Sequence, residues 1–162
     1  MNDALQTVSS AGPGGQAEGR EISGEVRHTL PKRERLSSRN DIERLFTCGE
    51  AFLVYPVKCT FRWSEGPEKR VMVIVPKRNH RKAVVRNRLK RLLREAYRLH
   101  KHRLSFSAGA DIALSYIAKG EPADYRTVEQ AVVSILNKLC TIRNEKTTRR
   151  QPAETDGGSG GR

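Results

Sequence analysis

The 162-residue chain has little of what builds membrane spans, disulfide frameworks or metal centres. No apolar run approaches the roughly 20 residues that cross a bilayer. Met1–Arg20 has neither the basic nor the apolar region of a signal peptide. The three cysteines, Cys48, Cys59 and Cys140, stand apart, with no histidine at ligand spacing. We therefore expect a cytoplasmic protein without disulfides or bound zinc, in which these thiols are small core residues.

Glycine is scarce in the central part of the chain. Nine of the 13 glycines lie in two terminal stretches, residues 1–26 and 146–162, which are polar and have no apolar period. We predict that both stretches are disordered tails. Hydrophobic residues make up 36% of the chain, enough for one core, so we expect a single domain at residues 27–145.

Acidic residues are almost missing from one segment. The chain has 31 Lys and Arg against 18 Asp and Glu, a net charge of +13. The segment from Lys69 to Arg103 holds 14 of the basic residues and one acid, Glu95. The rest of the chain has 17 residues of each sign and sums to zero. Such a concentration of one charge predicts a surface for a polyanion.

Apolar spacing predicts six elements in the central domain. A helix spans Arg39–Cys48, with Ser37 or Ser38 as its N-cap and Gly49 as its stop. The other five elements are strands at Leu53–Trp63, Arg70–Val75 and Asp111–Ala118, and helices at Ala83–His102 and after Asp124. Pro56 lies within the first of these strands and cannot donate a backbone hydrogen bond, which predicts that this strand is at a sheet edge or contains a bulge. This order predicts an α+β fold, a two-layer α/β sandwich of order α-β-β-α-β-α, with the second and third strands as parallel neighbours.

The helix at Ala83–His102 has one apolar and one cationic side. Its predicted core stripe is Val85, Leu89, Leu92, Ala96 and Leu99. Arginines recur on successive turns of the opposite side, which suits bidentate phosphate contacts. The apolar stripe is needed to cover the sheet, which disfavours a membrane-surface helix, and a preceding strand disfavours a helix-turn-helix DNA reader. Structured RNA is the favoured partner.

The run Ala83–Ala96, AVVRNRLKRLLREA, closely resembles the signature of the bacterial ribonuclease P protein subunit. Leu36-Ser37, Phe46 and Gly49 resemble the start of the same family, and the resemblance covers about Leu30 to Asn144. It implies a small protein that joins a catalytic RNA to remove 5′ leaders from precursor tRNA. It also implies a left-handed βαβ crossover. The active site would lie on the RNA with its magnesium, and the protein would supply no catalytic residue and bind no cofactor or metal.

The resemblance also implies two RNA-contacting surfaces. The first binds the catalytic RNA through Arg86, Asn87, Arg88, Lys90, Arg91 and Arg94, assisted by Lys77, Arg78, Arg81 and Lys82. The second is a cleft for the precursor tRNA leader, formed by Ile42, Phe46, Lys58, Thr60 and Arg62. Ile42 and Thr60 stand where the family often has aromatic residues, which predicts a cleft that relies more on charge. Asn79-His80 replaces a turn that commonly contains glycine.

Several alternatives stay open at this level. Phe46 fits a core position or a base-stacking platform equally well, and Tyr97 lies at the edge of the cationic side. The four histidines are scattered and the acids form no cluster typical of a protein nuclease. The expected partners are the catalytic RNA and precursor tRNA, with no membrane and no DNA. The alternative function is that of a ribosomal or ribonucleoprotein-assembly protein that binds RNA without processing it.

Overall fold

The computed structural model describes residues 29–149. Its helices are α1 (Arg39–Cys48), α2 (Ala83–His100) and α3 (Tyr125–Thr148), with short 3-10 turns η1 (Lys32–Glu34) and η2 (Lys101–Arg103). Its strands are β1 (Glu50–Val54), β2 (Val57–Ser64), β3 (Lys69–Ile74) and β4 (Gly109–Tyr116). The predicted tail at 1–26 lies outside the described residues. The second tail was predicted to begin at residue 146, but α3 continues to Thr148. The rest of that predicted tail, from residue 150, also lies outside the described residues.

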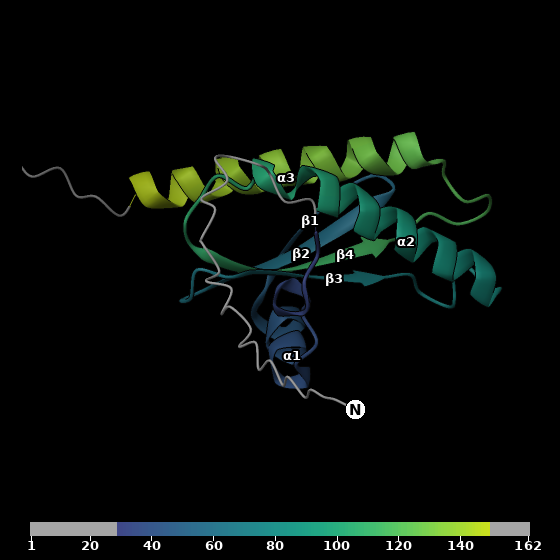
Figure 1. The fold of residues 1–162 in the computed structure, drawn as a ribbon, viewed down its shortest axis with the longest axis horizontal. Helices are drawn as coiled ribbons and strands as arrows, with labels where there is room; N and C mark the ends of the chain where they lie inside the picture. The colour runs from purple at the N-terminus through teal and green to yellow at the C-terminus, as the bar shows by residue number, and fades with distance from the viewer. Residues whose placement is uncertain (1–28, 150–162) are drawn as a thin grey trace, which may run out of the picture.

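The four strands form one mixed sheet in the order β1-β2-β4-β3. β1 pairs with β2 and β2 with β4 in antiparallel fashion, whereas β3 and β4 are parallel, in register from Lys69 with Ala110 to Ile74 with Ser115. The parallel pairing predicted for the strands on either side of the basic helix is confirmed, and α2 is the crossover between them (Figure 1). The left-handed sense of this crossover stays a prediction.

The strand predicted at Leu53–Trp63 is in fact two strands, so the element order is α-β-β-β-α-β-α. The chain reverses at Tyr55-Pro56, a cis peptide, and Val54 pairs with Val57 across this two-residue turn. The pairing puts Leu53 on the opposite face of the sheet from Val57. Leu53 and Tyr55 are therefore 54% and 70% exposed, although the alternation along the chain predicted them as core. β2 is also an interior strand, and the edge strand of this hairpin is β1.

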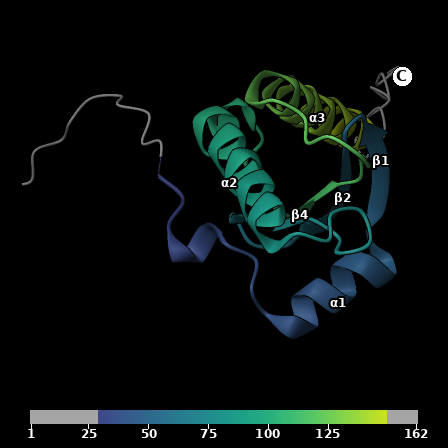
Figure 2. The same cartoon turned by 90° about the vertical axis from the view of Figure 1, so that its right-hand side faces the viewer.

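Two hydrophobic clusters lie on opposite faces of the sheet. The larger one packs α2 and α3 against Val57, Cys59, Phe61, Ile112 and Leu114, all buried. The smaller one lies beneath α1 and contains Leu36, Leu45, Ile42, Met72, Ile74 and Ala113. Figures 1 and 2 show α2 and α3 together on one side of the sheet and α1 on the other. The predicted α+β class is confirmed, and α1 adds a helix on the second face.

Local chemistry accounts for the ends of α1 and α3. The Ser38 hydroxyl accepts a hydrogen bond from the backbone amide of Asp41. The Asp124 carboxylate accepts one from the backbone amide of Thr127 at 3.0 Å, so both residues act as N-caps. After α1, a Cβ at Gly49 would lie 2.1 Å from the carbonyl oxygen of Leu45, so a side chain does not fit where the helix meets β1. Glycine is therefore required at this junction.

The buried stripe of α2 is broader than its sequence spacing predicts. Leu89 and Ala96 are buried as expected, but Leu93 and Tyr97 are buried as well, while Leu92 is only partly buried. The reason is that α2 packs against α3 in addition to the sheet. Tyr97 is thus a core residue, which settles its ambiguous position in the sequence.

The cysteines divide between core and surface. Cys59 is buried, and burial raises the pKa of its thiol to about 12. Cys140 is half-buried and packs against the main core, whereas Cys48, the last residue of α1, is exposed. The prediction that all three are core residues is wrong for Cys48, because it ends α1 at a position that the described residues leave exposed.

An ion-pair network fixes α1 to the sheet. Arg70 of β3 forms two parallel hydrogen bonds with the Asp111 carboxylate of β4, from Nε at 2.8 Å and from Nη2 at 3.1 Å. Its Nη1 donates to Asp41 of α1 at 2.8 Å. The Asp111 side chain is 1% exposed. The hydrogen bond from Arg70 lowers the pKa of Asp41, which favours the charged form of this carboxylate beside the guanidinium.

Replacing this arginine should destabilise the protein strongly. In Arg70→Met, the buried Asp111 carboxylate loses its cation, and we expect the free energy of unfolding to fall by about 3–5 kcal/mol. Urea unfolding followed by circular dichroism measures the change. Arg98→Met is the matched control, because it breaks a solvent-accessible i,i+3 pair with Glu95, and we expect it to lower the free energy of unfolding far less than Arg70→Met does. Equal losses in the two variants would contradict this role of Arg70.

Candidate nucleic-acid interface

The ten residues predicted to bind the catalytic RNA form a basic surface on α2, from Arg86 to Arg94, and on the loop before this helix. This basic surface comprises Lys77, Arg78, Arg81, Lys82, Arg86, Asn87, Arg88, Lys90, Arg91 and Arg94. Arg86 and Lys90 are half-buried and the other eight are exposed. Within residues 29–149, none of the ten forms an ion pair with an acidic side chain. The charge of the nine cations among them is therefore not neutralised by an acidic side chain within this part of the chain.

The start of α2 also lacks negative charge. Lys82 occupies the N-cap position without a side-chain hydrogen bond, and the first turn contains no acidic residue. The amide end of a helix carries a partial positive charge, which usually attracts an acidic side chain. Here that charge adds to the surrounding lysines and arginines, an arrangement that favours a phosphate at this end of α2.

The loop at residues 77–82 is anchored to the protein by residues that the sequence analysis did not assign to a site. Asn79 donates from Nδ2 to the carbonyl oxygen of Ile117 at 2.8 Å, and His80 Nε2 lies 3.0 Å from the carbonyl oxygen of Ala118. Arg86 donates from Nη1 to the carbonyl oxygens of His80 and Arg81. The signal in the sequence is the uncharged pair Asn79-His80 between two pairs of cations.

The residues predicted for the leader cleft share one face of the sheet. Because side chains alternate along β2, Lys58, Thr60 and Arg62 lie on the face that carries α1, opposite the main core. Lys58 is exposed and Arg62 half-buried, but Thr60 is buried at 6% exposure. Two cations of β2 therefore reach the surface on this face.

The two predicted residues of α1 differ in exposure. Ile42 packs into the cluster beneath α1, whereas Phe46, one turn later, is 49% exposed. The exposure of Phe46 excludes the core position that the sequence left open for it. Phe46, Lys58 and Arg62, which we call the leader surface after the predicted role, place one aromatic ring and two cations on the α1 side of the protein.

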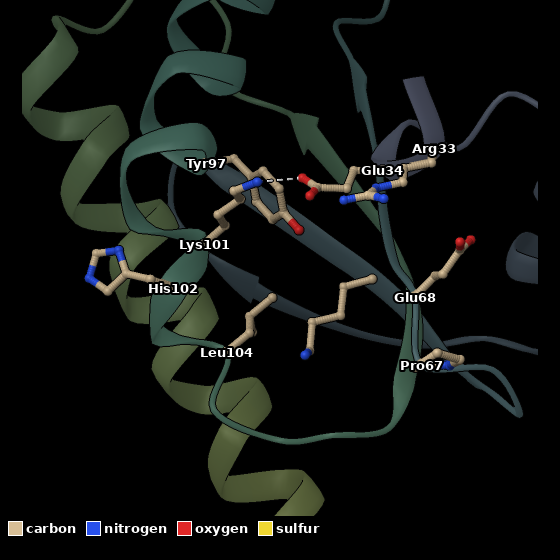
Figure 3. Close-up of a pocket in the computed structure, with 9 residues that line it drawn as sticks. Arg33, Glu34, Pro67, Glu68, Tyr97, Lys101, His102 and Leu104 are labelled. Carbon is tan, nitrogen blue, oxygen red and sulfur yellow. Dashed lines mark hydrogen bonds and ion pairs between the residues drawn. The ribbon is translucent and has the colours of Figure 1, made fainter. Parts of the chain in front are cut away.

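The other end of α2 differs in charge from its beginning. Lys101 donates to Glu34 Oε2 and to the carbonyl oxygen of Thr29, both at 2.6 Å, and Arg98 pairs with Glu95. A cavity of about 520 Å³ opens beside Lys101, lined by Tyr97, Leu104 and residues of η1 and of the β2–β3 turn (Figure 3). None of the residues predicted to contact RNA lines this cavity. The unneutralised cations are thus concentrated at the beginning of α2.

His100 and the acids serve structural contacts. His100 Nε2 lies 2.8 Å from Glu129 Oε1, linking α2 to α3, and this hydrogen bond lowers the pKa of Glu129. Asp41 and Asp111 are held by Arg70. Across residues 29–149, no three His, Cys, Asp or Glu side chains gather as a group that could hold a metal ion. Among the helices of this part of the chain, none is long and apolar enough to span a bilayer.

Comparison with known proteins identifies relatives over most of the chain. The family model for ribonuclease P matches residues 30–140. The ribonuclease P protein component of Porphyromonas gingivalis strain W83 is 42% identical over 120 residues, covering 68% of this chain and 85% of the relative. The component from Dictyoglomus thermophilum is 32% identical over 127 residues, covering 72% and 97%.

Solved structures show the same fold. The ribonuclease P protein of Thermotoga maritima matches with a TM-score of 0.57 and 29% identity, over 65% of this chain and 97% of that one. The Staphylococcus aureus protein matches with a TM-score of 0.56 at 19% identity, over 67% and 96%. The basic surface, the fold and these similarities agree, and the chain belongs to the family of ribonuclease P protein components.

Proposed function

We propose that this chain binds the catalytic RNA of ribonuclease P through the basic surface. The observation that carries the proposal is the set of cations at residues 77–94 that no acidic side chain of the described residues neutralises. Five arginines lie among the exposed members, and their planar guanidinium groups suit bidentate contacts to phosphate. Recognition of phosphates and 2′-hydroxyls on a structured RNA needs no reading of base edges.

The leader surface would hold the single-stranded 5′ leader of precursor tRNA. Lys58 and Arg62 are placed to neutralise leader phosphates, and the exposed ring of Phe46 offers a platform for a base. Thr60, being buried, contributes to the floor through packing. A protein that binds the leader increases the affinity of the holoenzyme for precursor tRNA relative to its affinity for mature tRNA, which has no leader.

In this proposal the chemistry takes place on the RNA. Magnesium ions bound there would activate the attacking water and stabilise the leaving oxygen. The protein contributes affinity and orientation: its cations offset repulsion between two RNA molecules that must approach closely. The product is tRNA with a mature 5′ end and a free leader.

The direct test is cleavage of precursor tRNA at low magnesium by the cognate catalytic RNA, with and without this protein. We expect 5′ processing only when both components are present, because the protein's cations replace screening that magnesium supplies at higher concentration. Gel analysis of the 5′ product measures the result. If the protein bound the RNA but never changed its cleavage, a role in RNA assembly without processing would replace this one.

Loss of one arginine from the basic surface should change the salt dependence of RNA binding. For Arg88→Ala, we expect the slope of log affinity against log salt to shrink by about 0.7–0.9, the value for one lost phosphate contact. Filter binding to the catalytic RNA across a salt series measures the slope. Lys138→Ala is the control, because it removes one positive charge from α3, where Lys138 lies over the Phe52 ring. An unchanged slope for Arg88→Ala would remove this residue from the interface.

Truncation of Phe46 should affect leader-containing substrates selectively. We expect Phe46→Ala to weaken holoenzyme binding of precursor tRNA by about tenfold, the effect of losing one stacked base, and to leave binding of leaderless tRNA unchanged. Equilibrium binding with both RNAs measures the difference. Cys48→Ala, an exposed position at the end of the same helix, is the control. Equal effects on both RNAs would show that Phe46 does not contact the leader.

A further inference from the structure

The loop between β3 and α2 combines outward-facing cations with two uncharged residues that face the protein. His80 is 6% exposed, and its ring packs against Tyr116 with 5.5 Å between the ring centroids. Asn79 is half-buried. The four cations on either side of this pair, Lys77, Arg78, Arg81 and Lys82, are exposed. Asn79 and His80 are therefore turned away from the solvent-facing side of the loop.

Both inward side chains bind the short segment that follows β4. The amide of Asn79 donates to the carbonyl oxygen of Ile117, and His80 binds that of Ala118. Because a carbonyl oxygen only accepts, His80 must carry a proton on Nε2. The backbone amide of Ile117 donates in turn to the carbonyl oxygen of Pro56 at 3.0 Å. The segment that receives the loop is thus itself tied to the β1–β2 turn.

The loop is also held from its other side. The backbone amides of Asn79 and His80 donate to the carbonyl oxygen of Pro76, at 3.1 and 3.3 Å. From α2, Arg86 reaches back to the carbonyl oxygens of His80 and Arg81, at 3.0 and 2.5 Å. Hydrogen bonds with the segment after β4, with Pro76 and with Arg86 therefore hold residues 79–81, the middle of a six-residue loop that carries four positive charges.

We propose that Asn79 and His80 are positioning residues, which hold the cations of residues 77–82 in the arrangement that RNA binds without contacting the RNA themselves. The inference rests on the proposed function of the basic surface. Four like charges in six residues repel one another, and an untethered loop would lose conformational freedom each time it bound RNA. A loop that is already fixed in the free protein avoids this loss, which increases affinity at unchanged charge.

The salt dependence of binding separates positioning from contact. His80→Ala removes no phosphate contact, so we expect binding to the catalytic RNA to weaken by about tenfold while the salt slope keeps its wild-type value. Asn79→Ala should act in the same direction. Arg78→Ala, a change in the same loop, should instead reduce the slope by about 0.7–0.9. His80→Gln keeps an amide donor for the Ala118 carbonyl and should restore most of the affinity.

Two measurements on the free protein show that the effect is local. Amide hydrogen exchange in residues 77–82 should become faster in His80→Ala, with exchange in β2 and β4 unchanged. Melting curves establish that each variant is folded at the binding temperature. If His80→Ala fails to fold, the same measurements are made on Asn79→Ala. The Asn79 side chain is only half-buried, so its removal leaves a smaller cavity than removal of the His80 ring.

Two results would overturn the positioning role. One is wild-type affinity in both folded variants. The other is a fall in salt slope equal to that of Arg78→Ala, which would make these residues RNA contacts. Failure of the wild-type protein to bind the catalytic RNA is a separate outcome, which would overturn the proposed function and with it this inference.

Discussion

The Arg70 guanidinium is the point on which the arrangement of α1 and the sheet depends. It binds the buried carboxylate of Asp111 on the neighbouring parallel strand and the carboxylate of Asp41 on α1. A buried carboxylate is tolerated when it is paired and hydrogen-bonded, so Asp111 requires Arg70 in this position. The same cation then sets where α1 lies over the sheet.

The two faces of the sheet differ in how far helices cover them. One face is covered by α2 and α3 and holds most of the buried apolar residues. The other is covered only in part by α1, above a small cluster that includes Ala113 and Met72. Because most of the buried apolar residues lie on the first face, the residues left exposed on the second face are available for binding. The exposed side of α2 has the same freedom, since its apolar side is used by the sheet and α3.

Much of the fold and of the candidate site follows from local signals. The cap at Asp124, a cap at Ser37 or Ser38, the parallel neighbours on either side of the basic helix and the excess of positive charge on that helix were all predictable from spacing and composition. The hairpin at Tyr55-Pro56 was not, because apolar alternation continues across a two-residue turn although the chain reverses there. The inward contacts of Asn79 and His80 were equally hidden, because their acceptors are backbone carbonyls about 38 residues away in the chain.

The sequence alone determined the composition of the interface: a segment from Lys69 to Arg103 with one acid among 14 basic residues, on a helix whose other side is apolar. Charge and helical period are local properties, so they can be read without a structure. The tertiary structure decided which cations are left unpaired, that Tyr97 is buried while Phe46 is exposed, and that the basic loop is fixed to the end of β4. These features depend on contacts between residues distant in the chain, and such contacts exist only once the sheet has formed.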